Sequence, residues 1–136
     1  MNHRTFLSLL LMMFVSVTLA VAAPPSDAEA SKLLAGEWVM PPDRLNAVVK
    51  GASFQFKEDG IFTSKGLLLL REEKVQIEFD GKWSIKDGVL TEEITHTSHP
   101  AIIPSGLVTR DTIISITDKE YKIRTAKGQE ERYVKP

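Results

Sequence analysis

Apolar and polar residues alternate along most of the chain from residue 53 onward. Residues 75–80 read Val-Gln-Ile-Glu-Phe-Asp, and the same two-residue period recurs at 54–56, 83–85 and 112–116. A period of two is typical of a β-strand that buries one face, because successive side chains point to opposite sides of a sheet. Each of these segments therefore predicts a half-buried strand.

Short polar turns separate the alternating segments. Asp59-Gly60 and Asp87-Gly88 are strong hairpin signals, since glycine accepts the positive φ that tight turns require. We expect further turns at 118–119 and 126–129, a loop at 100–106, and a strand end at Gly81. Consecutive strands joined in this way predict an antiparallel meander in an all-β sandwich or barrel.

A different pattern precedes these strands. Residues 28–35 read AEASKLLA and predict a short helix capped by Ser26, followed by a strand from Gly36 that ends at Pro41-Pro42. Residues 44–50 fit either a strand or a helical turn. The run Leu67–Leu70 fits either a strand buried on both faces or an exposed apolar edge that contacts a ligand or partner.

The N-terminus has the order of a cleavable secretory signal. Arg4 precedes an uncharged apolar run at 6–20, and small residues follow in Ala20-Val21-Ala22-Ala23. The run is shorter than the ~20 residues that span a bilayer, so a membrane anchor is the less favoured alternative. We expect a signal peptide at 1–23, a linker with the start of the helix at 24–32, and one barrel domain at 33–136. The mature protein is then periplasmic or secreted, with no stable membrane anchor.

Composition narrows the chemistry. The chain has no cysteine, which excludes disulfides, cysteine-ligated metals and thiol nucleophiles. Its 17 basic and 18 acidic residues give a net charge of −1 without a basic patch, so we expect no nucleic-acid partner.

An ordered set of motifs resembles the small bacterial lipocalin-like (calycin) domains. L-x-G-x-W occupies 34–38, F-x-F-x-x-D-G-x-F occupies 54–62, G-x-W-x-I with D-G-x-L occupies 81–90, and Ile116, Asp118, Tyr121 and Gly128 follow. The resemblance covers Leu33–Val134. It implies an up-and-down antiparallel β-barrel of about eight strands with a short N-terminal helix.

The resemblance also implies structural roles. Trp38 is expected to pack across the closed end of the barrel, covered by a late arginine for which Arg124 and Arg132 are both candidates. The other residues expected to be structural are Gly36, Gly60, Gly81 and Trp83.

Inward-facing side chains of such a barrel form either a filled core or a binding pocket. As a pocket they suit a small hydrophobic molecule, oriented by Tyr121, His96 or Arg110. The expected ligand-binding residues are Phe56, Leu68, Leu70, Ile77, Phe79, Ile94, His96, Ile114 and Tyr121. The alternative is a filled barrel that acts as an envelope protein–protein module, an inhibitor or accessory factor, with Leu67–Leu70 as its contact.

No residue pattern predicts catalysis. His96 and His99 would face opposite sides of a strand, and the adjacent pairs Glu72-Glu73, Glu92-Glu93 and Glu130-Glu131 would do the same, which disfavours a metal site or an acid/base dyad. Glu92 nevertheless interrupts the apolar row formed by Leu90 and Ile94. We expect a non-enzymatic protein without catalytic residues, bound metal or cofactor.

Overall fold

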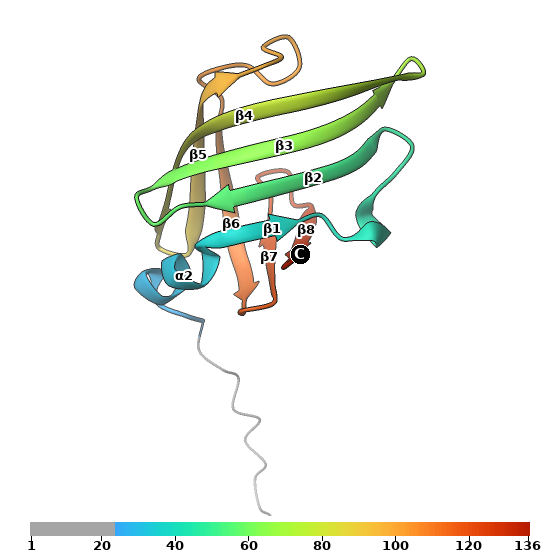
Figure 1. Cartoon of the computed structure of the whole chain (residues 1–136). Helices are drawn as coiled ribbons and strands as arrows, with labels where there is room; N and C mark the ends of the chain where they lie inside the picture. Colours follow the sequence, from blue (N-terminus) through green and yellow to red (C-terminus); the bar gives the residue numbers. More distant parts are fainter. Residues whose placement is uncertain (1–23) are drawn as a thin grey trace, which may run out of the picture.

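Residues 24–136 form a closed, eight-stranded antiparallel barrel in the computed structural model (Figure 1). The expected signal peptide at 1–23 lies outside the described residues. The strands follow chain order around the barrel: β1 (Gly36–Val39), β2 (Val49–Phe56), β3 (Ile61–Leu70), β4 (Glu73–Lys86), β5 (Val89–Thr97), β6 (Val108–Ile116), β7 (Glu120–Arg124) and β8 (Glu130–Val134). The predicted all-β meander barrel is confirmed.

The helix α2 (Asp27–Leu34) covers one end of the barrel, opposite the β5–β6 loop (Figure 1). Ser26 caps it, since the Glu29 backbone N–H donates to Ser26 Oγ at 3.2 Å. Ala30 and Leu34 are buried beneath it. The Asp27 carboxylate accepts the backbone N–H groups of Asp87 and Gly88 at 2.8 and 3.0 Å, which fastens the helix to the β4–β5 turn.

Removal of the Asp27 carboxylate is expected to loosen this end of the barrel. Asp27→Ala leaves two backbone donors without their charged acceptor, at a cost of about 1–2 kcal/mol in the free energy of unfolding. Urea unfolding monitored by tryptophan fluorescence measures the loss. Glu29→Ala, which removes an exposed carboxylate from the same helical turn, serves as the control and should change the value by less than about 0.5 kcal/mol. Equal losses in the two variants would contradict the fastening role.

The covered end contains the densest part of the core. Trp38 is fully buried, its Nε1 donates to the Leu34 carbonyl at 2.7 Å, and its ring meets Tyr121 edge-on at 4.8 Å. Phe56, Phe62 and Leu90 belong to the same buried cluster. Trp38 therefore has the closed-end position that the resemblance implied.

The cation over Trp38 comes from a residue that the sequence did not single out. Lys135 Nζ lies 4.2 Å from the centroid of the Trp38 ring. Neither candidate arginine occupies this position, because Arg124 pairs with Glu130 and Arg132 pairs with Asp43 and Glu120. The late arginine that the resemblance implies has no counterpart over Trp38, and a lysine takes its place.

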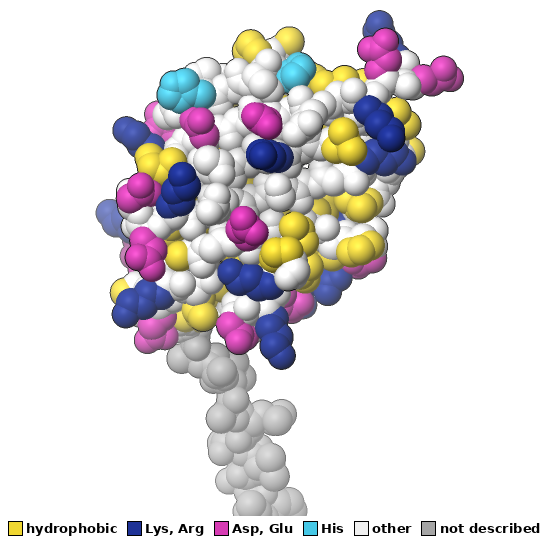
Figure 2. Space-filling model, in the orientation of Figure 1, with side chains coloured by type: hydrophobic (Ala, Val, Ile, Leu, Met, Phe, Trp, Pro, Cys, Tyr) yellow, Lys and Arg dark blue, Asp and Glu magenta, His cyan; other side chains and the backbone are white. Residues whose placement is uncertain are grey.

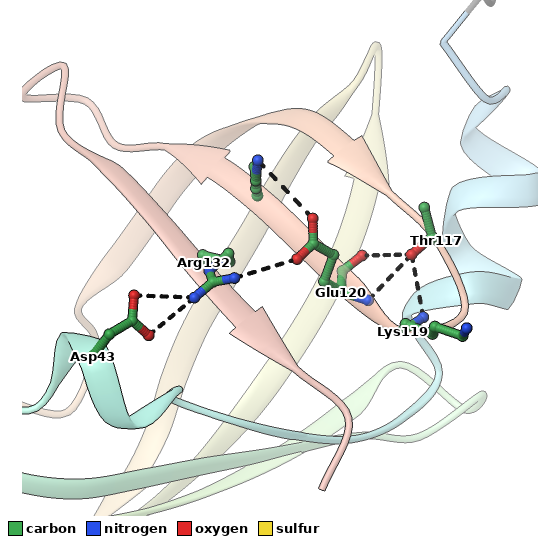
Figure 3. Close-up of polar contacts among 6 residues, drawn as sticks. Asp43, Thr117, Lys119, Glu120 and Arg132 are labelled. Atoms are coloured by element: carbon green, nitrogen blue, oxygen red, sulfur yellow. Dashed lines mark hydrogen bonds and ion pairs between the residues drawn. The ribbon is translucent and has the colours of Figure 1, made fainter.

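The barrel closes between its first and last strands through a short seam. β1 and β8 share one register pair, Val39 with Val134. Arg132 Nη2 donates to both carboxylate oxygens of Asp43 at 2.9 and 3.0 Å, while Nη1 lies 3.6 Å from Glu120 Oε2 (Figure 3). Asp43 belongs to the 3₁₀ helix η1 (Pro42–Arg44), so side chains extend the seam beyond the backbone ladder.

The barrel formed by residues 24–136 has three register shifts, and those in the β4–β5 and β6–β7 pairs decide which predicted site residues face the interior. In the β4–β5 pair, Asp80 lies opposite His96 and Gly81 lies opposite Ile94, which leaves Thr95 as an extra residue. In the β6–β7 pair, Ile114 is the extra residue between Ile113 and Ser115. Strict alternation therefore fails after each bulge.

Gly81 does not end a strand, contrary to the prediction. β4 runs without interruption from Glu73 to Lys86, and Gly81 lies at the bulge within it. A Cβ atom at Gly81 would lie 1.8 Å from the backbone oxygen of Glu93, so the approach of β5 requires a glycine there.

The two ambiguous segments are also resolved. Residues 44–50 contain the end of η1, a turn and the start of β2. Leu67–Leu70 pairs along β4, Leu67 and Leu68 also pair with β2, and all four leucines are half-buried. The run is therefore internal to the sheet and is not an exposed edge.

Candidate functional site

A cavity of about 220 Å³ lies inside the barrel, toward the end that carries the β5–β6 loop. Side chains from β2 and from β4 to β8 form its wall, and two residues of the β5–β6 loop border it. The lining residues are Phe54, Phe79, Glu92, Ile94, Ile103, Leu107, Thr109, Asp111, Tyr121, Ile123, Glu131 and Tyr133. The lining is mostly apolar, and its charged members are all acidic.

The alternation of β5 places Glu92 in this cavity. Leu90 lies in the closed-end core and Ile94 is also buried, so Glu92, between them, must face the interior. Protein encloses its carboxyl group, and the part of the side chain that stays accessible faces the cavity. Burial raises the pKa of Glu92 to about 8, and the nearby carboxylates of Asp111 and Glu131 add to that rise.

Two further carboxyl groups line the same space from β6 and β8. Burial raises the pKa of Asp111 to about 6, with a further contribution from the charge of Glu131. Glu131 accepts a hydrogen bond from the Tyr133 hydroxyl at 3.0 Å. Burial and this neighbouring carboxylate raise the pKa of the Tyr133 hydroxyl above its ordinary value, so the tyrosine stays a neutral donor.

Glu92 and Tyr121 lack polar partners within residues 24–136. Burial and neighbouring negative charges raise the pKa of both groups, and no hydrogen bond contributes to either shift. Tyr121 is only 2 % exposed, yet this part of the chain contains no side-chain oxygen that is both sealed from solvent and unpaired. The Tyr121 hydroxyl and the Glu92 carboxyl are therefore reached from the cavity that they line.

Solved structures with the same architecture are found for this barrel. A lipocalin-like protein from Bacteroides uniformis ATCC 8492 superposes with a TM-score of 0.52 at 14% sequence identity, over 76% of this chain and 99% of that one. The fold is lipocalin-like. An uncharacterized protein from Bacteroides eggerthii DSM 20697 matches with a TM-score of 0.50, also at 14% identity and over 76% and 99% of the two chains. No family model matches the sequence. The curated proteins contain no match either.

The lipocalin-like barrel places the expected binding residues in three different settings. Phe79, Ile94 and Tyr121 line the cavity. Phe56 and Ile77 are buried but do not line it, and Phe56 packs beneath it with its ring 6.4 Å from that of Tyr121.

Four of the expected residues lie elsewhere. Leu68 and Leu70 are half-buried at the far end of β3, outside the cavity lining. His96 faces outward because of the bulge at Thr95, with 82% of its side chain exposed and its Nδ1 2.9 Å from Asp80 Oδ1. Ile114 is exposed at the second bulge. Arg110, considered as a polar contact for the ligand, is exposed as well. The expectation that His96, Ile114 and Arg110 face the interior is wrong.

The acidic part of the lipocalin-like cavity is what the sequence interpretation missed. The Glu92-Glu93 and Glu130-Glu131 pairs fit solvated strand faces, but one member of each pair faces inward and the other is exposed. No sequence pattern marks Asp111, which lies between exposed Arg110 and Thr112. The one available signal was Glu92 itself, which interrupts the apolar row of β5.

The outer surface of the barrel offers weaker candidates for a functional site. Figure 2 shows acidic and basic side chains interspersed over one face, without an area of a single sign. A more open, polar depression on β2 to β5 is lined by residues that include Lys65, Glu78, Asp80 and His96. Among the described residues, no cluster of three or more His, Asp or Glu is placed to hold a metal ion. The helices described between 24 and 136 are too short or too polar to cross a bilayer.

Proposed function

We propose that this protein is an exported, non-enzymatic carrier or sensor that binds a small molecule inside its barrel. The observation that carries the proposal is the interior cavity, whose walls are apolar while a few polar groups converge on it from β5, β6, β7 and β8. Such a combination is typical of sites where an apolar body supplies affinity and polar groups fix orientation. The uncharged apolar run at 6–20 supports export.

The size of the cavity limits the ligand. A cavity of ~150 Å³ holds one benzene ring, whereas sites for drug-sized ligands measure roughly 300–1,000 Å³. At about 220 Å³ this cavity suits one ring or a short branched chain with a small polar group. A long acyl chain exceeds that volume.

The cavity can be filled by substitution without changing the rest of the barrel. Thr109 lines the cavity, while Thr112 lies on the outer face of the same strand. Thr109→Phe is expected to weaken binding of a fitting ligand at least ~10-fold, because the new ring occupies the space of the ligand. Thr112→Phe makes the same change outside and should leave binding unaltered.

Three one-ring compounds serve as ligands: 2-phenylethylamine, 2-phenylethanol and phenylacetate. Titration calorimetry against the mature protein measures their affinities. The proposed function predicts that at least one binds and that Thr109→Phe reduces its affinity while Thr112→Phe does not. Failure of all three to bind, or equal binding by the Thr109→Phe variant, would refute the proposal.

The alternative of an envelope protein–protein module lacks the feature that suggested it. That alternative rested on Leu67–Leu70 as an exposed apolar edge, and the run is half-buried and paired within the sheet. No other observation favours it over the carrier.

A further inference from the structure

The charges that face the cavity have one sign. Glu92, Asp111 and Glu131 line it, and no Lys, Arg or His does so among the residues that the structure describes. Buried carboxyl groups are normally paired with a cation or satisfied by hydrogen-bond donors, because their desolvation is otherwise costly. Among residues 24–136 one such donor reaches the three carboxyl groups, the Tyr133 hydroxyl on Glu131.

Several polar groups that line the cavity have no partner among residues 24–136, and the Asp111 carboxyl is one of them. The Glu92 carboxyl and the Tyr121 hydroxyl receive no hydrogen bond from the rest of residues 24–136, although both are enclosed by protein. They come from β5 and β7 and border the same space. A ligand with several hydrogen-bond donors on one atom would satisfy both.

Aromatic rings surround this space. Phe54 lies edge-on to Phe79 at 6.3 Å and to Tyr133 at 5.3 Å, and Tyr133 stacks on Tyr121 at 5.0 Å. Ring faces attract cations through their quadrupole, and the attraction grows where water is excluded. The rings and the carboxyl groups therefore both favour a positively charged ligand.

We propose that the cavity binds an organic cation, a protonated amine on a small apolar body. The ammonium group lies between the carboxyl groups of Glu92 and Asp111 and the Tyr121 hydroxyl, and the apolar body packs against Phe54, Phe79 and Ile103. This inference rests on the proposed function and names its ligand class.

Proton release should accompany binding. The titratable groups that face Glu92 are Asp111 on β6, Tyr121 on β7, and Glu131 and Tyr133 on β8, and none of them carries a positive charge. With a pKa of about 8, Glu92 is mostly protonated at neutral pH in the free protein. A bound ammonium group favours the ionised form, so the proton leaves and the affinity for the amine rises with pH up to about 8.

Affinities of 2-phenylethylamine and its neutral isostere 2-phenylethanol, measured by calorimetry at pH 6 and pH 8.5, test the inference. A charge-assisted hydrogen bond predicts that the amine binds ~10- to 100-fold more tightly than the alcohol at pH 8.5. The preference should shrink about 10-fold or more at pH 6, where Glu92 holds its proton. The affinity for the alcohol should be the same at both pH values.

Variants assign the effect to the cavity. Glu92→Gln keeps the shape of the side chain, removes its charge and should abolish most of the preference for the amine. Asp111→Asn provides a second test of the same kind. Glu93→Gln is the matched control, because Glu93 is the adjacent residue of β5 and is exposed on the outer face. It should bind the amine as the wild type does.

Four outcomes would overturn the inference alone. Equal affinities for amine and alcohol, or unchanged amine binding by Glu92→Gln, would show that the site does not select a cation. Tightest binding of phenylacetate would indicate an acid that shares a proton with Glu92. If the Glu92→Gln and Glu93→Gln variants lose equal amounts of affinity for the amine, the amine is attracted to the outer surface of the protein and not to the cavity. In each case binding that is sensitive to Thr109→Phe would leave the proposed function intact, whereas failure of all three compounds to bind would refute both.

Discussion

Replacement of Gly81 by alanine is expected to destabilise the barrel by roughly 4 kcal/mol or more, a large fraction of the ~5–15 kcal/mol that typically separates folded from unfolded protein. The added Cβ would lie 1.8 Å from the Glu93 backbone oxygen, 2.8 Å from its carbonyl carbon and 3.0 Å from Ile94 Cα. All three are backbone atoms of β5, so no change of side-chain rotamer relieves the contact. The β4–β5 pair must separate at the bulge, and this is the pair that holds Glu92 and Ile94 at the cavity.

Equilibrium urea unfolding monitored by far-UV circular dichroism measures the effect. Gly51→Ala is the matched control, since Gly51 is also a strand glycine but has open space around its Cβ position. We expect that variant to lie within about 1 kcal/mol of the wild type, on the stable side if anything. A Gly81→Ala protein as stable as Gly51→Ala would contradict the close approach of the two strands.

Glu92 is expected to make the protein less stable as the pH rises. Its pKa of about 8 in the folded protein exceeds the value of 4.5 for an unperturbed glutamate, so the folded state holds a proton that the unfolded state releases. Stability therefore falls as the pH rises through the window between these two values. Glu92→Gln removes the titrating group, so its stability relative to the wild type should increase by about 3 kcal/mol between pH 5 and pH 8.

The comparison requires free energies of unfolding for both proteins at each pH. Asp111, whose pKa is also raised, contributes a trend of the same sign in both proteins. Glu93→Gln, with its exposed side chain, should differ from the wild type by the same small amount at both pH values. If the Glu92→Gln advantage does not depend on pH, the Glu92 carboxyl group ionises as freely as in water.

Ionisation of Glu92 is predicted to lower the stability of the protein but to strengthen its binding of an amine. A group that costs stability is easier to understand in a binding site than in a core, because functional sites often retain locally unfavourable residues. If both predictions hold, the carboxyl group that lowers the stability of the ligand-free barrel is the one that selects the ligand.

The sequence allowed the architecture to be predicted because local signals coincide with it. The Ser26 cap, the Asp59-Gly60 and Asp87-Gly88 turns, and the alternation of 75–80 each reflect interactions within a few residues. Gly81 was misread because a glycine that ends a strand and a glycine that permits close approach of a neighbouring strand look alike in sequence. Only the position of Glu93 on β5 distinguishes them.

The site was less accessible to prediction, for two physical reasons. A one-residue bulge reverses the facing of every residue beyond it, which turned His96 outward on β5 and put Ile116, out of phase with exposed Ile114, in the core on β6. The acidic cluster also brings together β5, β6 and β8, which no local pattern can place side by side. The contact between Lys135 and Trp38 was equally unpredictable, because the two residues lie far apart in the sequence.

The short seam between β1 and β8 has a consequence for the order in which the barrel forms. Every other strand pair joins neighbours in the chain and closes a short loop, whereas the pair of Val39 and Val134 closes a loop that contains almost the entire domain. The entropy lost on closing a loop grows with its length, and long-range pairings are the slow ones in folding. The hairpins from β1 to β8 can therefore assemble first as an open, curled sheet. Asp43, Arg132 and Lys135 then act late, on the downhill side of the folding barrier, where they slow unfolding more than they speed folding.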